Sequence, residues 1–128
     1  MKNLTALFAL LPLIAQADYF PNAAQDEFDN VPLEYALIQR GELVLHMDMA
    51  RVSVAKGKEY GLITCEMATL VESWRNVRFE RMRIENRDGN QGVTWRVNNR
   101  ECEKITLRSD SDAELDRKYF GRDRFNTF

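Results

Sequence analysis

The chain has 128 residues, of which 30% are charged and 45% are hydrophobic, and its formal net charge at pH 7 is −2. This length suits one domain with a modest core, and the chain holds no internal repeat or low-complexity tract. The slightly acidic balance argues against a nucleic-acid-binding protein, because such proteins present excess positive charge to phosphate groups.

The first 17 residues, MKNLTALFALLPLIAQA, have the pattern of a secretory signal peptide. Lys2 is followed by an apolar run from Leu4 to Ile14 and by the small-residue pattern Ala15-Gln16-Ala17. The run is shorter than the roughly 20 residues that span a bilayer, and no later segment is apolar for longer. We therefore expect cleavage near Ala17 and a periplasmic or secreted protein that does not span a membrane.

The chain has two cysteines, Cys65 and Cys102, which allow only one intramolecular disulfide. Such a bond is typical of an oxidising compartment. Closing a loop of this length should stabilise a small domain by about 3–4 kcal/mol. A catalytic dithiol is the less favoured interpretation, because redox pairs are usually close in sequence.

After the signal peptide we expect an N-terminal arm over residues 18–32, with two prolines and no clear period, and then one β-rich domain over residues 33–128. Residues 43–50 alternate in hydrophobicity as a half-buried strand does. The phase slips near Ala50-Arg51, which a β-bulge would explain. Residues 56–59 indicate a turn, and residues 60–74 fit a strand or a helix, with the strand favoured.

The clearest local pattern is a hairpin over residues 77–98. A two-residue turn at Asp88-Gly89 would pair Ile84 with Val93, whereas a longer loop through Gln91 would pair Ile84 with Trp95, and both registers keep the same apolar face. A further strand carrying Cys102 is expected over residues 101–107. Ser111 and Glu114 form a capping-box pattern that predicts a short C-terminal helix at about 111–120. The predicted fold is therefore all-β, a small antiparallel sandwich or open barrel with one C-terminal helix. If residues 60–74 are helical, the class becomes α+β.

Residues 75–108 contain nine basic and five acidic residues, whereas residues 18–74 contain four basic and ten acidic ones. Guanidinium groups on a hairpin can bind carboxylates or phosphates, or they can pair with the chain's own acids. The candidate partner contacts are Arg78, Arg81, Arg83 and Arg96. Trp74 is a further candidate, as a stacking surface, although packing in the core is the favoured role for both tryptophans.

No catalytic, metal or cofactor site is predicted. His46, the only histidine, shares an expected strand face with Asp48, but a hydrolase would also need a nucleophile such as Ser53, Thr64 or Ser73 within reach. A carboxylate cluster at Asp110, Asp112 and Asp116 lacks the features of a calcium loop and suits a helix N-terminus instead.

The functional hypothesis is an exported, non-catalytic module that binds another envelope or secreted protein, as an inhibitor, an immunity-type protector or an accessory subunit. Anionic glycans and lipid headgroups are the other ligands considered for the arginines. The alternative function is a small-ligand or envelope-glycan binder that uses a barrel mouth or an exposed Trp74.

Overall fold

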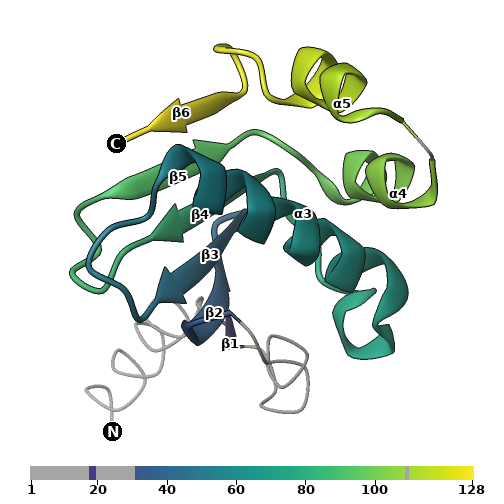
Figure 1. Cartoon of the computed structure of the whole chain (residues 1–128). Coiled ribbons are helices and arrows are strands. Elements are labelled where there is room, and N and C mark those ends of the chain that lie inside the picture. The colour runs from purple at the N-terminus through teal and green to yellow at the C-terminus, as the bar shows by residue number, and fades with distance from the viewer. Residues whose placement is uncertain (1–17, 20–30, 109) are drawn as a thin grey trace, which may run out of the picture.

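The computed structural model describes residues 18–19, 31–108 and 110–128. The expected signal peptide and most of the expected arm lie outside the described residues. The described part forms a six-stranded sheet, and helix α3 crosses one of its faces (Figure 1). In chain order the elements are β1 (Asp18–Tyr19), β2 (Leu33–Gln39), β3 (Glu42–Met47), α3 (Val54–Leu70), the 3-10 turn η2 (Glu72–Trp74), β4 (Arg81–Glu85), β5 (Gly92–Trp95), α4 (Asn99–Leu107), α5 (Asp112–Tyr119) and β6 (Phe125–Thr127).

The strands lie side by side in chain order, β1 to β6, and the sheet is mixed. Strands β3 and β4 are parallel, while every other neighbouring pair is antiparallel. A parallel pair needs a long crossover connection, and α3 supplies it. The expected all-β antiparallel fold is therefore wrong: the protein is α+β, the class named for the case that residues 60–74 are helical.

Helix α3 occupies the segment where we expected a turn and most of a strand. Ser53 caps its start, since the Ser53 hydroxyl accepts a hydrogen bond from the backbone amide of Lys56 (3.1 Å). Gly57, part of the expected turn, and Gly61, which helped to favour a strand, lie four residues apart and face the sheet. A Cβ atom at Gly57 would lie 2.5 Å from Val93 Cγ2, and one at Gly61 would lie 2.9 Å from Trp95 Cε3. The glycines thus permit close packing of helix on sheet.

Replacing Gly57 by alanine is expected to lower the free energy of unfolding by about 1–2 kcal/mol, because overpacking against Val93 outweighs the helix propensity of alanine. Urea denaturation measures this change. In a double-mutant cycle, Gly57→Ala should cost less in a Val93→Ala background, since the clashing methyl groups are then absent. Equal costs in both backgrounds would contradict the close-packing role of this glycine.

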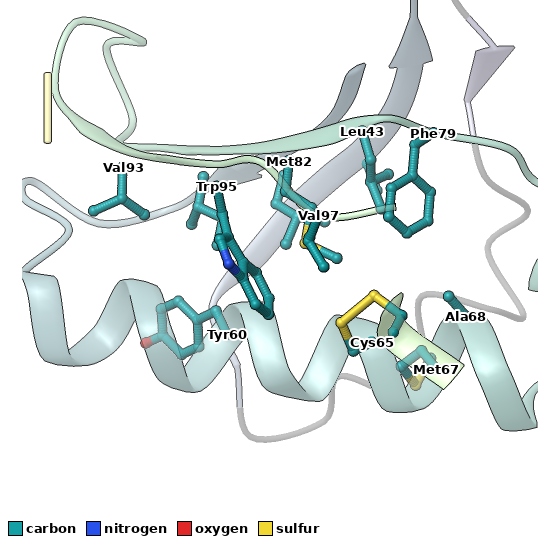
Figure 2. Packing of buried hydrophobic residues seen from close by; sticks show 14 of the residues in the cluster. Leu43, Tyr60, Cys65, Met67, Ala68, Phe79, Met82, Val93, Trp95 and Val97 are labelled. Carbon is teal, nitrogen blue, oxygen red and sulfur yellow. A yellow bond between two sulfur atoms is a disulfide. The ribbon is translucent and has the colours of Figure 1, made fainter. Parts of the chain in front are cut away.

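The core lies between the sheet and helix α3 (Figure 2). Met82 and Trp95 point from the sheet toward the helix, which presents Tyr60 and Cys65 in return, and all four are at most 3% exposed. Helix α5 and the turn after it cover the outer end of this core. There the Trp95 indole donates a hydrogen bond to the Tyr119 carbonyl (2.7 Å). This bond satisfies the polar atom of a fully buried tryptophan.

Of the two registers left open for the hairpin, β4 and β5 adopt the one that places Ile84 opposite Val93. The segment after it is corrected: Cys102 lies in helix α4, not in a strand. Asn98 and Glu101 form a capping box at its start, each side chain accepting a backbone hydrogen bond from the other residue. The predicted disulfide is confirmed, and it joins Cys65 of α3 to Cys102 of α4.

Helix α5 begins at the predicted cap, because the Ser111 hydroxyl accepts a hydrogen bond from the Glu114 amide (3.3 Å). Leu115 and Tyr119 are half-buried against the core, as their shared helix face predicts. Across the described ranges, no helix combines the length and the hydropathy needed to cross a membrane.

Candidate functional site

A groove of about 730 Å³ lies where the end of α3, the segment after η2 and the outer side of α4 come together. Its lining includes Leu70 at the end of α3, Arg75 and Arg78 after η2, and Arg100 and Leu107 of α4. We call this surface the arginine groove and define it by these five residues. Figure 1 shows α3 and α4 side by side.

Trp74 fixes the segment that carries two of the arginines. Its side chain is completely buried in the core, and its backbone amide donates to the carbonyl of Val71 (3.0 Å) directly after α3. Arg75 is the next residue and is exposed, so the buried indole holds it at the groove rim. The Arg78 guanidinium then donates to the Arg75 carbonyl (2.8 Å), which places both arginines on the same side.

Asn99, the first residue of α4, holds the opposite wall in place. Its side-chain amide donates to the Val77 carbonyl (2.5 Å), and its oxygen accepts from the Phe79 amide (2.8 Å). One side chain thereby satisfies a donor and an acceptor of a segment without regular structure. Together with the disulfide between α3 and α4, these bonds make the groove a preformed feature of the fold.

The arginine groove combines positive charge with exposed apolar surface. Within residues 31–108 and 110–128, no carboxylate lies within ion-pair distance of Arg75, Arg78 or Arg100. Two other lining residues, Glu80 and Glu103, are acidic. Leu70 is 53% exposed and Leu107 is 62% exposed. A guanidinium group offers five hydrogen-bond donors, so the groove can bind anionic groups that also carry apolar side chains.

The structure separates the four predicted contact arginines. Arg78 lies in the groove. Arg81 pairs with Glu42 (2.9 Å), and Arg83 pairs with Glu85 (2.9 Å) on the sheet face opposite α3. Arg96 is mostly exposed and lies 3.7 Å from Asp123.

Of these four arginines, Arg83 makes the most contacts within the chain. Besides Glu85, it donates to the Gly89 carbonyl (3.1 Å), and its guanidinium lies 3.9 Å from the centroid of the Phe128 ring. These contacts use two of its nitrogen atoms as donors and one face of its guanidinium group within the chain. Arg83 is therefore a weaker candidate for a partner contact than Arg78.

Trp74 is placed where it cannot contact a partner, because its side chain is 0% exposed. The favoured packing role of both tryptophans is confirmed, since Trp95 is also 0% exposed. The sequence places Trp74 beside a charged residue, and this neighbour suggested exposure. The η2 turn instead directs the indole inward and Arg75 outward.

His46 lies on the sheet face opposite α3 and is 9% exposed. Its Nδ1 lies 2.6 Å from Glu85 Oε2, its Nε2 lies 3.5 Å from Glu34 Oε2, and its ring stacks on Tyr35. Asp48, its expected partner, pairs with Arg87 instead (2.9 Å). The β-bulge between Leu33 and Tyr35 shifts the register of β2 just where Glu34 reaches the histidine.

Two of the three nucleophiles considered for His46 have structural roles, and the third, Ser73, lies in the η2 turn. Ser53 caps α3, and the Thr64 hydroxyl is buried and donates to the Tyr60 carbonyl (2.7 Å). The acidic residues near α5 form ion pairs with lysines, Asp110 with Lys118 (3.5 Å) and Asp116 with Lys58 (3.2 Å). In the described part of the chain, no group of three or more histidine, cysteine or acidic residues is arranged to hold a metal ion.

Sequence reasoning missed four of the five residues that define the groove. Arg75 and Arg100 entered only as part of a basic region, and Leu70 and Leu107 were expected in strands or at their ends. The capping box at Asn98 and Glu101 is the local pattern that would have predicted α4, and with it the placement of Arg100 one turn before Glu103.

Comparison with protein-family models, curated protein sequences and solved structures finds no match to this chain. The candidate function therefore rests on the geometry and charge of the arginine groove.

Proposed function

We propose that this protein is exported and acts as a non-catalytic module that binds another envelope or secreted protein through the arginine groove. The observation that carries the proposal is a preformed groove in which three arginines have no described carboxylate partner and two leucines are more than half exposed. Protein interfaces are enriched in arginine and in apolar contacts at their centre. An inhibitor, an immunity-type protector and an accessory subunit are all modules of this kind.

Two features support export. The first 17 residues have the signal-peptide pattern, and Cys65 and Cys102 are joined in the disulfide that an oxidising compartment permits. N-terminal sequencing of the protein recovered from an envelope fraction tests this part of the proposal. A first residue at Asp18 would support it, and an intact Met1 would overturn it.

Neither of the two sites considered for the alternative, a small-ligand or glycan binder, is available in the described part of the structure. Trp74 is fully buried, and in the part of the chain that the structure describes the sheet is open, with β1 and β6 at its edges, and forms no barrel mouth. Arg81 and Arg83 are paired within the chain, which leaves the groove as the better contact surface.

Charge reversal in the groove is expected to weaken partner capture at least tenfold. The full chain, with its disulfide intact, is immobilised and exposed to an envelope extract from its host, and the amount of each captured protein is measured. Arg75→Glu/Arg100→Glu reverses the charge of two arginines that have no carboxylate partner among the described residues, and it should reduce capture of the partner. Thermal unfolding should be nearly unchanged, because both side chains are exposed.

The matched control is Arg117→Glu/Arg122→Glu, which makes the same charge change at two exposed residues outside the groove. This control should capture the partner like the wild type. Equal capture by the groove variant would overturn the groove as the contact surface. Failure of the wild type to capture any protein stoichiometrically would overturn the binding-module proposal itself.

A further inference from the structure

The arginine groove offers a ligand charged contacts from arginines and apolar contacts from leucines, and the two together limit the chemical classes of ligand that fit. Three arginines and two glutamates line it, so its charge favours an anionic ligand. Phosphate groups, sulfated glycans and protein carboxylates all satisfy guanidinium donors. Charge alone therefore does not separate these classes.

The exposed leucines distinguish a protein ligand from phosphate groups and sulfated glycans. Leu70 and Leu107 are 53% and 62% exposed at the groove, and burying such side chains stabilises a complex by roughly 25 cal/mol for each Å² of apolar surface removed from water. Phosphate groups and sulfated sugars present no apolar side chain that would cover a leucine. A protein segment with aliphatic or aromatic residues does, so the leucines favour a polypeptide.

The two acidic lining residues, Glu80 and Glu103, limit how acidic residues can be arranged along the ligand. Glu103 lies three residues after Arg100, so the two side chains are neighbours on α4. Glu80 lies two residues after Arg78 on the opposite wall. A uniformly acidic ligand would bring carboxylates against both glutamates, which is unfavourable. Carboxylates separated by apolar residues avoid this repulsion.

The length of the groove sets the size of the ligand. Helix α4 has nine residues, which corresponds to about 14 Å. An extended chain advances about 3.3 Å per residue, so about four or five residues follow the helix from end to end. This is the size of a short linear segment.

We propose that the arginine groove binds a short segment of a partner protein in which acidic residues alternate with aliphatic or aromatic ones. This inference rests on the proposed function and specifies the partner chemistry at the same site. The carboxylates pair with Arg75, Arg78 and Arg100, and the apolar side chains cover Leu70 and Leu107. Glu80 and Glu103 discriminate against continuous runs of acidic residues.

Selection from a randomised phage-displayed peptide library on the immobilised full chain tests this inference. Enriched peptides should combine aspartate or glutamate with leucine, isoleucine or phenylalanine within about five residues. Their affinities, measured by fluorescence anisotropy, should fall at least tenfold when the acidic residues become amides and at least tenfold when the apolar residues become alanine. Raising the salt concentration should also weaken binding, because the arginines are exposed.

Two single substitutions and one control assign the contact to the groove. Arg100→Gln should weaken peptide binding about tenfold, and Leu107→Ser should weaken it severalfold without changing its salt dependence. Arg122→Gln, outside the groove, should leave binding unchanged. Peptides that bind the Arg100→Gln variant as tightly as the wild type would overturn the inference.

Competition separates the ligand classes. A sulfated oligosaccharide or phosphatidylglycerol vesicles that displace the peptides at lower concentration than the peptides' own dissociation constants would overturn the polypeptide partner. Failure to enrich any peptide, together with groove-dependent capture of an envelope protein, would show that the partner presents a folded surface. That result would overturn the segment inference and leave the proposed function standing. Enriched peptides without any captured envelope protein would support the segment chemistry and count against the proposed function.

Discussion

Loss of the Cys65–Cys102 disulfide is expected to lower the free energy of unfolding by about 3–4 kcal/mol. The bond joins residues 37 positions apart, so its removal restores a large number of conformations to the unfolded chain. A small domain has a total stability of about 5–15 kcal/mol, and the loss is a large share of that. Urea denaturation of Cys65→Ala/Cys102→Ala against the wild type measures it.

The same variant should bind groove ligands more weakly. The disulfide joins α3 to α4, and these two helices supply Leu70, Arg100 and Leu107. Treatment with a reductant provides the control. It should destabilise the wild type only slowly, because Cys65 and Cys102 are both 0% exposed, and it should not affect the double alanine variant. If the free energy of unfolding of the variant lay within about 1 kcal/mol of the wild-type value, packing of α4 on α3 would suffice to hold the groove without the disulfide.

Gly92→Ala is expected to destabilise the protein by about 3 kcal/mol, from backbone strain and from a clash with backbone atoms. Gly92 begins β5 with φ of +157°, and a Cβ atom there would lie 2.0 Å from the Ile84 carbonyl oxygen of β4. Its backbone also exchanges two hydrogen bonds with Phe128, next to β6 (3.2 and 3.0 Å). Relieving the clash would therefore disturb β4, β5 and β6 together. Thermal and urea unfolding measure the loss.

Gly89→Ala is the matched comparison in the same hairpin. Gly89 has φ of +71°, but a Cβ atom there would meet only the flexible carboxylate of Glu85, at 3.2 Å. Its cost should be about 1 kcal/mol, the usual penalty of a left-handed conformation. If Gly89→Ala proved as costly as Gly92→Ala, the strand-to-strand clash would not be the dominant effect.

The parts of the fold that sequence predicted correctly depend on neighbours in the chain. Asp88-Gly89 between two segments of alternating hydrophobicity predicts a hairpin, and both registers that it allows bury the same face. Ser111 predicts the start of α5 through a hydrogen bond that reaches only three residues along the chain. The count of two cysteines predicts the disulfide, since only one pairing exists.

The fold class was wrong because α3 is determined by distant residues. Two glycines lower its intrinsic helix propensity, and Thr64 and Thr69 add β-branched residues. The glycines are required by Val93 and Trp95, more than 30 positions further on, which leave no room for a side chain between helix and sheet. With α3 recognised, β3 and β4 become a parallel pair joined by a crossover helix, and the sheet becomes mixed.

The sequence by itself determined the signal-peptide pattern, the unique cysteine pair, the hairpin and the local helix cap, because each depends on composition or on residues a few positions apart. Only the tertiary structure decided which arginines are available to a partner. Arg81 and Glu42 are 39 positions apart and pair across adjacent strands, whereas Arg75 and Arg100 reach the groove without such a carboxylate among the described residues. An ion pair forms wherever the fold brings opposite charges within a few ångströms, and for residues far apart in the chain their separation in sequence does not predict that distance.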